Sequence, residues 1–574
     1  MDSYKQRFDL LNSDQKEAVL CDGNCLVLAT AGSGKTETMA VKAARLLNEG
    51  YVVGAVTFTK DAAKELKERI LSYVTEDKKK QLLVGTFHAL FYKMLAKRPL
   101  IPSDAERNRY LAAAIMEHEL EMKPRDAMKI IDQIQMKEVP EFEDPSHRLL
   151  YESYQYQIKR NGQTDFGDMV REAVTGLENG SIQPFPLDYL LVDEMQDIDP
   201  LQLRWVLKHF ERGCVVTMVG DDDQSIYSFR NAMGMKAIDK FVSETHANQI
   251  VLGTNYRSHE EILKVAANVI NQNIARIPKH IQSAKGPGGH IGIKTFVKPE
   301  FEAEWIADDI IQKRNESPGC EIAVLSRNNR HLDIIESLLR SSEIPYFRPA
   351  DKSIFSQPDI AIFFNLLDTI AGAKKNAGVE LLLRYMDIDQ KDRDSLLEMG
   401  VDNFKDRSRS DLVAYHISDP AIKNYRELCG LIKQWRVQND AERYSLVIHG
   451  VGEWMISKLA LNADWQKKVI LAACMALNRL QGPLNKRTKY LLESDNNKVE
   501  TGAVILSTLH GSKGLQYDVV YMIRCEDTVC PAEGSSIEEE RRLFFVGLTR
   551  AKRNCIVSHT SVNSRSIFVA EMFN

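Results

Sequence analysis

Residues 24–36 read NCLVLATAGSGKT, a short apolar run that leads into a glycine-rich turn. The apolar run predicts a buried strand, and the pattern after the turn predicts that a helix begins there. In this setting glycines let backbone N–H groups close around phosphate oxygens, and the helix N-terminus adds partial positive charge. The stretch therefore predicts a phosphate-binding loop made of Ala31, Gly32, Ser33, Gly34, Lys35 and Thr36.

A second apolar run ends in two carboxylates that would complement the phosphate-binding loop. In the P-loop pattern Lys35 reaches the β- and γ-phosphates and Thr36 holds Mg²⁺, although Ala29 stands where the pattern has its first glycine. Residues 190–194 read LLVDE, which places Asp193 to coordinate Mg²⁺ and Glu194 to orient the attacking water. Alone, a glycine turn or an acidic strand end is also typical of an ordinary loop. Together they indicate a nucleoside triphosphatase.

Other apolar runs predict the sheets around these loops. Strands are expected at 51–59, 82–86, 189–193 and 214–220, with a helix at 60–73. Short apolar strands that alternate with helices are typical of a parallel sheet covered on both faces. A second series of strands is expected at 289–297, 321–326, 503–508, 518–524 and 555–559. The expected fold class is therefore α/β, with two parallel-sheet domains.

Charged, strand-poor segments with a helical pattern interrupt both series. Pro278 and the run GPGG at 286–289 fit a linker between the two halves. The expected boundaries are 1–90 and 161–275 for the first sheet domain, 91–160 for its insert, 276–370 and 500–574 for the second sheet domain, and 371–499 for its insert.

Composition excludes several classes of protein. The chain has 574 residues, with 75 Lys and Arg against 80 Asp and Glu, so bulk charge alone does not attract polyanions, although a local basic groove can. No apolar stretch is long enough to span a membrane and the N-terminus lacks an apolar signal core, so we expect a cytoplasmic protein with no membrane partner. Nine cysteines without a ligand cluster predict reduced thiols and no structural zinc or iron–sulfur cluster.

Aromatic and cationic side chains gather after a third strand. Residues 219–230 read VGDDDQSIYSFR, so Gln224, a candidate sensor of the γ-phosphate, precedes Tyr227, Phe229 and Arg230. Aromatic faces beside a cation grip single-stranded nucleic acid without sequence preference. The alternative is that both rings belong to the core. The sequences TFT and GTFH, at 57–59 and 85–88, also end strands of this sheet, so these groups converge on one edge.

At this point the chain resembles the UvrD/Rep family of superfamily 1 DNA helicases. The motifs that carry the resemblance are LNSDQ (11–15), TFTKDAAKELKERI (57–70), GTFH (85–88), TDFGDM (164–169), VDEMQD (192–197), VGDDDQSIYSFRNA (219–232), NYRS (255–258), STLHGSKGLQYDVVY (507–521) and EEERRLFFVGLTRAKR (538–553). The two inserts match only by position and helical character. The resemblance implies two RecA-like domains, ATP and Mg²⁺ as cofactors, and single-stranded DNA and its junctions with duplex as partners.

The resemblance also implies roles for individual residues. Gln15 would read the adenine edge, Tyr256 would stack on the adenine, and Glu194 would be the catalytic carboxylate. Gln224 would couple the γ-phosphate to DNA, and Arg257 and Arg550 would be arginine fingers. The implied DNA contacts are Thr57, Phe58, Lys60, His88, Tyr227, Phe229, Arg230, His510 and, near the end of the chain, Phe568.

Four features depart from the family pattern. Glu37 replaces an Arg that packs on the adenine, so base discrimination is expected to loosen, and Gln516 replaces a Glu near the ribose. Lys60 replaces an Asn and should add phosphate affinity. The stretch Asn554–Ser566 is short where family members carry a hairpin that splits the duplex.

These features support two hypotheses about function. The first is an ATP-driven translocase on single-stranded DNA in repair, recombination or defence, with the 3′→5′ polarity and helicase activity that the resemblance implies. The second is a DNA-stimulated ATPase that unwinds poorly and regulates a partner, such as a nuclease of a repair or antiviral defence system. A fused nuclease and a metabolic kinase are both disfavoured. The oligomeric state is left open.

Overall fold

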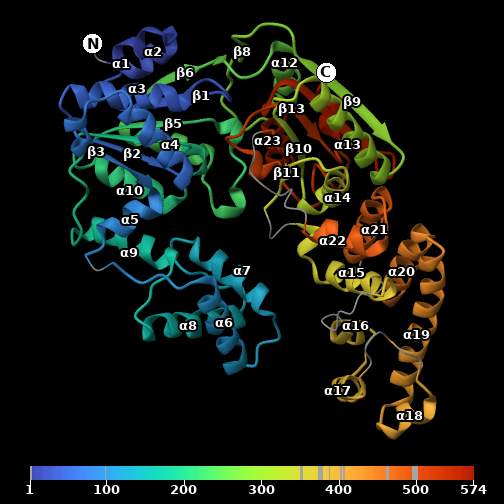
Figure 1. Cartoon of the computed structure of the whole chain (residues 1–574). Helices are drawn as coiled ribbons and strands as arrows, with labels where there is room; N and C mark the ends of the chain where they lie inside the picture. The colour runs from blue at the N-terminus through green and yellow to red at the C-terminus, as the bar shows by residue number, and fades with distance from the viewer. Residues whose placement is uncertain are drawn as a thin grey trace. The chain divides into compact units, whose positions relative to one another are not determined.

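The structure is a computed structural model (Figure 1) and describes residues 3–96, 98–349, 353–372, 379–386, 388–400, 404, 407–459, 464–493 and 502–573. The chain divides into two compact units, Met1–Pro287 with Ser536–Phe545, and Gly288–Ser535 with Val546–Asn574. The first boundary lies inside the GPGG run at 286–289. In the described part of the chain, the helices are all too short or too polar to cross a membrane.

The first unit is built on a six-stranded parallel sheet in the order β3-β2-β4-β5-β1-β6. The strands are β1 (Cys25–Ala29), β2 (Val53–Thr57), β3 (Leu82–Thr86), β4 (Tyr189–Val192), β5 (Val215–Gly220) and β6 (Asn248–Leu252). Five of the six were predicted. The edge strand β6 was missed, because only Ile250 and Leu252 of its residues are buried and it lacks a continuous apolar run.

Helices cover both faces of this sheet (Figure 1). Alternate residues of β1 enter different cores: Cys25, Val27 and Ala29 pack with α2 (Ser13–Leu20), α3 (Lys35–Asn48) and α4 (Lys60–Leu71). Leu26 and Leu28 pack on the other side. The helices of that side are α5 (Phe87–Met94), α9 (Phe166–Asn179), α10 (Pro200–Phe210) and α11 (Met235–Thr245). The unit also contains α1 (Ser3–Asp9), α12 (Glu260–Ile270) and the short parallel pair β7 (Thr254–Asn255) and β8 (Gln282–Ser283).

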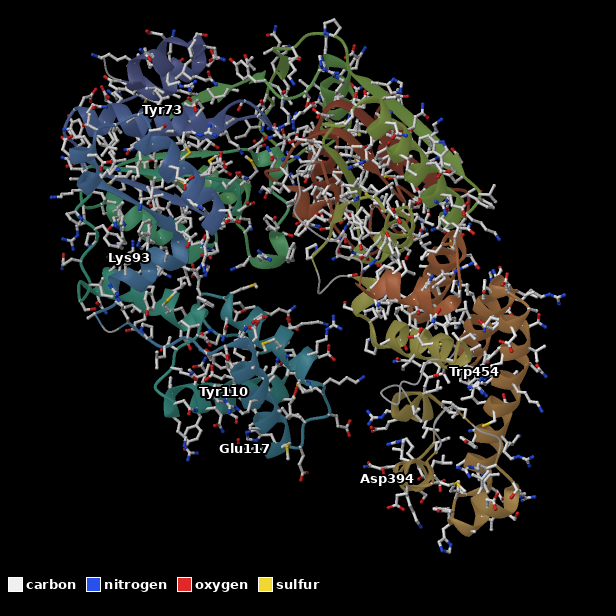
Figure 2. All side chains as sticks on the ribbon, viewed as in Figure 1. Tyr73, Lys93, Tyr110, Glu117, Asp394 and Trp454 are labelled. Atoms are coloured by element: carbon white, nitrogen blue, oxygen red, sulfur yellow. The ribbon has the colours of Figure 1, made fainter. Side chains whose placement is uncertain are left out.

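Three helices form the insert of the first unit, α6 (Asp104–Glu117), α7 (Pro124–Gln135) and α8 (Pro145–Arg160). They enclose a core of their own that includes Tyr110, labelled with Glu117 in Figure 2. The preceding helix α5 still packs in the core of the sheet through Phe87 and Phe91. The helical insert therefore begins after α5.

The second unit repeats this plan. Its parallel sheet has the order β11-β12-β10-β13-β14-β9. The strands are β9 (His290–Phe296), β10 (Ile322–Ser326), β11 (Tyr346–Phe347), β12 (Val504–Thr508), β13 (Tyr517–Met522) and β14 (Ala551–Thr560), of which only the two-residue β11 was not predicted. The helices that pack on the sheet are α13 (Pro299–Glu316) and α14 (Asp333–Ser341). α23 (Ile537–Leu548), most of which belongs to the first unit, leads into β14, and α24 (Ile567–Glu571) follows β14.

A larger set of helices forms the insert of the second unit and encloses a separate core that contains Trp454, labelled in Figure 2. The helices are α15 (Pro358–Ile370), α16 (Val379–Tyr385), α17 (Gln390–Glu398), α18 (Arg409–Ala414), α19 (Asp419–Asp440), α20 (Tyr444–Lys458), α21 (Asp464–Arg479) and α22 (Leu484–Glu493). Part of the predicted insert at 371–499 lies outside the described residues. The expected fold class, two parallel-sheet α/β domains that are each interrupted by helices, is confirmed.

Candidate functional site

The glycine-rich turn joins β1 to α3, as the sequence predicts. Gly32 and Gly34 have φ values of 70° and 80°, a left-handed conformation that glycine adopts without strain. A Cβ atom on Gly32 would lie 2.8 Å from Asn255 Nδ2, and one on Gly34 would lie 2.7 Å from Gln15 Nε2. Both positions therefore require glycine for backbone conformation and for space.

A buried asparagine fixes the turn from the opposite side. The Asn255 amide donates to the backbone oxygen of Ala31, and its Oδ1 accepts from the backbone nitrogens of Arg257 and Ser258, each at 2.8 Å. The backbone nitrogen of Tyr256 donates to the oxygen of Gly32 at 2.9 Å. Because of these bonds, the phosphate loop and the NYRS segment, residues 255–258, form one rigid arrangement.

Lys35 and Glu194 meet in front of this loop. Lys35 Nζ lies 3.3 Å from Glu194 Oε2, and both side chains are partly exposed. Glu194 follows β4 with φ 51°, an unusual conformation for a non-glycine residue, and its Oε2 also accepts a hydrogen bond from Gln196 Nε2. The carboxylate is thus held beside the lysine by the backbone and by a neighbouring amide.

The residues present fit a nucleoside triphosphate with Mg²⁺. Ser33 Oγ is buried with no hydrogen-bond partner among the described residues, and it sits in the loop whose N–H groups would surround a phosphate. Thr36 lies in the first turn of α3, and the buried Asp193 lies next to Glu194 at the end of β4. A hydroxyl and a carboxylate are the oxygen ligands that Mg²⁺ prefers.

Gln15 and Tyr256 flank the loop where an adenine is expected. Gln15 is buried, its Nε2 donates to the oxygen of Ser33 at 2.9 Å, and its Oε1 accepts from the backbone nitrogen of Asn12 at 3.1 Å. Asn12 in turn donates to the Tyr256 hydroxyl at 2.9 Å, while the tyrosine ring stays largely exposed. Gln15 therefore links α2 to the phosphate loop, and Tyr256 offers a ring face beside it.

Glu37, the departure noted in the sequence, lies in the first turn of α3 and is held by α4 and the residues after it. Arg69 Nη1 lies 3.1 Å from its Oε2, and the Tyr73 hydroxyl donates to its Oε1 at 2.8 Å. The Glu37 carboxylate thus binds Arg69, so that an arginine of α4 lies beside the first turn of α3.

The loop after β5 carries the candidate sensor. Gln224 is buried and its Nε2 donates to Asp221 Oδ2 at 2.7 Å. The backbone nitrogen of Asp221 donates to Gln196 Oε1 at 2.9 Å, and the same glutamine contacts Glu194. One hydrogen-bonded chain thus connects the phosphate loop with Gln224.

Arg257 lies in the NYRS segment beside the phosphate loop. Burial lowers the pKa of Arg257 to about 10, with partial compensation from Glu194, so this guanidinium stays charged in a poorly solvated place.

Three residues further on, the aromatic and cationic side chains cluster. The rings of Tyr227 and Phe229 are 5.8 Å apart at 69°, and the Arg230 guanidinium lies 5.3 Å from the first ring and 5.7 Å from the second. Phe229 is 60% exposed. The alternative that Phe229 is a core residue is therefore wrong, whereas the Tyr227 ring is half-buried.

The ends of β2 and β3 carry further predicted contacts. Thr57 pairs in register with Thr86, so the side chains that follow both strands lie on one edge of the sheet. Thr57 is buried, Phe58 is half-buried against Phe87 with ring centres 5.5 Å apart, and Lys60 and His88 are exposed. His88 packs edge-on to the exposed ring of Phe166 at 5.5 Å.

The remaining predicted residues belong to the second unit. Arg550 is fully buried and donates to the backbone oxygens of Val546 at 2.9 Å and Leu515 at 3.2 Å. His510 is half-buried just after β12, and Gln516 is exposed just before β13. Phe568 in α24 has no exposed surface, so its assignment as a base-stacking residue is wrong for this conformation, because no base can reach the ring.

Sequence reasoning did not single out three residues that organise the site. Gln196 and Asn255 were quoted within motifs, but their amides bridge separate loops and only their burial reveals this. Lys279 carried no motif signal and lies buried against Asp221, Asp222 and Asp223. The amide bridges of Gln196 and Asn255, and the contact of Lys279 with aspartates distant in the sequence, can be recognised only from the three-dimensional structure.

The fold and this loop define a two-sheet protein of the P-loop class. The UvrD/REP helicase N-terminal domain matches residues 11–245, and the UvrD-like helicase C-terminal domain matches residues 250–405 and 473–562. The chain belongs to the UvrD/Rep helicase family. Residues 406–472, within the second helical insert, fall outside both matches.

Relatives along most of the chain are named helicases. The ATP-dependent DNA helicase PcrA of Staphylococcus aureus (strain MRSA252) is 25% identical over 626 aligned positions, which cover 97% of this chain and 84% of the relative. The ATP-dependent DNA helicase PcrA of Staphylococcus epidermidis (strain ATCC 12228 / FDA PCI 1200) is 26% identical over 634 positions, with the same coverage.

Proposed function

We propose that this protein is an ATP-dependent DNA helicase that translocates on single-stranded DNA with 3′→5′ polarity. The observation that carries the proposal is the hydrogen-bonded chain from Lys35 through Glu194, Gln196 and Asp221 to Gln224. It ends three residues before the half-buried Tyr227 and five before the exposed Phe229, so a change at the γ-phosphate has a short route to a stacking surface. Family membership and the relatives named as ATP-dependent DNA helicases support the same proposal.

Each part of the proposed cycle has residues that suit it. Lys35 and the loop N–H groups would bind the phosphates, Thr36 and Asp193 would hold Mg²⁺, and Glu194 would orient the attacking water. In the present conformation Lys35 pairs with Glu194, so binding of phosphates to the lysine would release the carboxylate for this task. Gln224 and Arg257 contact the γ-phosphate, and Arg550 joins them from the second RecA-like domain. Gln15, Glu37 and Tyr256 would lie at the base, and Gln516 is assigned to the ribose by the family resemblance.

Phe229→Ala is expected to weaken binding to single-stranded DNA by about 1–3 kcal/mol, or roughly 5–150-fold, because a stacking ring is lost. Melting temperature should change little, since the ring is mostly exposed. Fluorescence anisotropy with labelled oligonucleotides and a thermal melt measure both quantities.

Phe573→Ala is a matched control, because this ring in the second unit is 62% exposed and no DNA contact is assigned to it. Wild-type affinity in Phe229→Ala, with a lowered melting temperature, would show that the ring serves packing instead.

A second candidate function is a DNA-stimulated ATPase that regulates a nuclease or another partner and unwinds weakly by itself. The observation that favours it is the stretch Asn554–Ser566. Residues through Thr560 belong to β14, between β13 and β9 in the sheet, and Ser561–Ser566 alone remain before α24. This leaves no room there for the strand-separating hairpin that the family resemblance predicts.

Weak unwinding is therefore expected of the chain alone, alongside strong DNA-dependent ATPase and single-strand translocation. Each base-pair step costs about 1.4 kcal/mol of stacking, and without a wedge the motor waits for thermal fraying. Strand displacement on 3′-tailed and 5′-tailed duplexes of increasing length, under single-turnover conditions, tests this and the polarity. Efficient displacement of long duplexes by a monomer would contradict the expectation, and the helices at 406–472 would then be the place to look for a substitute wedge.

A further inference from the structure

A buried lysine sits at the centre of the loop that carries Gln224. The Lys279 side chain has no exposed surface, and its Nζ lies 3.0 Å from Asp221 Oδ1 and 3.1 Å from Asp223 Oδ2 and contacts Asp222 directly. Arg276 also binds Asp223 with two hydrogen bonds, at 2.9 and 2.8 Å. Three carboxylates thus face two cations, which leaves one net negative charge.

The protein itself supplies the cation at the centre of this cluster. Oxygen atoms of the three aspartates lie within 4.8 Å of one another, which resembles a cation site. The ammonium group of Lys279 fills the position between them, and the backbone nitrogen of Ile277 donates to Asp222 Oδ2 at 2.8 Å. Without the lysine, like charges at this separation in a buried place repel strongly.

Asp221 connects the lysine with the sensor. One of its carboxylate oxygens, Oδ1, faces Lys279, and the other, Oδ2, accepts from Gln224 Nε2 at 2.7 Å. The backbone nitrogen of Gln224 also donates to the backbone oxygen of Asp221 at 2.9 Å. The orientation of the Gln224 amide is therefore set by a carboxylate whose own position depends on Lys279.

The segment that carries Lys279 also holds the NYRS segment. A few residues later, Lys285 Nζ donates to the backbone oxygen of Arg257 at 2.6 Å, and Ser283 Oγ donates to that of Ser258 at 2.8 Å. Residues 276–285 thus contact the backbones or side chains that place both Gln224 and Arg257, and they lie just before Pro287, where the long segment of the first unit ends. Residues 276–285 therefore help to position both Gln224 and Arg257, the two side chains of this unit assigned to the γ-phosphate.

We propose that Lys279 is a positioning residue for ATP hydrolysis: it fixes Asp221, which aims the Gln224 amide at the γ-phosphate. The inference rests on the function proposed above, in which Gln224 contacts that phosphate. Loss of the lysine would let the amide turn away without touching the groups that bind ATP. The lysine therefore affects turnover and its coupling to DNA, and not nucleotide affinity.

The test uses a charge-matched variant of the full chain, since Lys279→Met alone leaves an excess carboxylate and can unfold. Lys279→Met with Asp222→Asn restores the wild-type net charge of the cluster, and an asparagine oxygen still accepts from Ile277. We expect a melting temperature near that of the wild type, a KM for ATP within about threefold, and a kcat on single-stranded DNA at least tenfold lower. Lys240→Met, on the exposed side of α11, is the control.

If Lys279 only stabilised the fold, the effects of its substitution and of a Gln224 substitution on kcat would be independent. We expect Gln224→Ala to lower kcat to a similar extent. Combined with the charge-matched variant, it should lower kcat by less than a further twofold. Wild-type kcat in the folded charge-matched variant, or fully additive losses, would overturn the proposal. If that variant does not fold, Lys279→Met with Asp223→Asn has the same net charge and is judged by the same criteria.

The same data separate this proposal from the proposed function. DNA stimulation of the wild-type ATPase tests the function. The ratio of variant to wild-type kcat, measured with and without DNA, tests Lys279. A wild-type enzyme that ignores DNA but loses kcat on the Lys279 substitution would contradict the function and keep the positioning role.

Discussion

Glu194→Gln is expected to stop ATP turnover and leave ATP binding intact. The carboxylate lies beside Lys35 at the end of β4, where it can orient and deprotonate the attacking water. An amide of the same shape still accepts from Gln196 but is no base, so the loss should be about 10²–10⁴-fold, the range for a general acid–base group. Folding should be unaffected, because the backbone and the side-chain volume are kept.

Steady-state phosphate release and binding of a fluorescent nucleotide separate the two effects. Glu211→Gln, which removes an exposed carboxylate paired with Lys208, controls for the loss of charge. Lys35→Ala should abolish turnover as well, but by weakening the hold on the phosphates. If Glu194→Gln hydrolyses ATP at the wild-type rate, the assignment of the catalytic carboxylate is wrong.

Arg550→Ala should give the other large effect, a fall in hydrolysis of up to about 10³–10⁵-fold, the range for an arginine finger. Arg550 and Lys35 belong to different units, so the finger role requires the units to close on ATP. In this conformation the guanidinium is buried and bonded to the oxygens of Val546 and Leu515, so its release from these bonds would be part of that closure.

Removal of this buried side chain also takes one donor from the carbonyl of Val546, which still accepts from Thr549 Oγ1, and one from that of Leu515, so some loss of stability is expected. Arg550→Lys keeps a cation there and separates stability from catalysis: it should melt closer to the wild type yet hydrolyse ATP slowly, because lysine lacks the planar fork. Binding of single-stranded DNA should be unchanged in both variants. Unchanged stimulation of the ATPase by DNA in Arg550→Ala would contradict the closure mechanism.

Most strands of the two sheets were predictable because they are continuous apolar runs; the edge strand β9 is the exception, since it is partly exposed along its length and was still predicted. β1, β4 and β10 are buried along their whole length, which is the condition for such a run. β6 and β11 were missed for the opposite reason: one is an exposed edge strand and the other has two residues. The ends of the inserts were harder to predict, because α5 and α15 are both rich in apolar residues but pack in a sheet core and in a helical core, respectively.

The candidate site was predictable where chemistry demands a residue type in a fixed local setting. The phosphate loop and the Asp193-Glu194 pair have such a setting, and the structure brings Lys35 and Glu194 together. Exposure could not be read from the sequence, so Phe229 and Phe568 were both predicted as DNA contacts although one is open and the other buried. Lys279 was invisible for a related reason, since its partners lie more than fifty residues away in the sequence.

The measurement that tests the central claim most directly is ATP hydrolysis by the purified chain with and without single-stranded DNA. If ATP hydrolysis at the phosphate loop is coupled to DNA binding at Tyr227, Phe229 and Arg230, saturating single-stranded DNA should raise kcat at least tenfold. The Phe229→Ala variant should then need more DNA to reach the same rate. Glu194→Gln should remain inactive under both conditions. Hydrolysis that depends on Lys35 and Glu194 but does not respond to DNA would contradict the account.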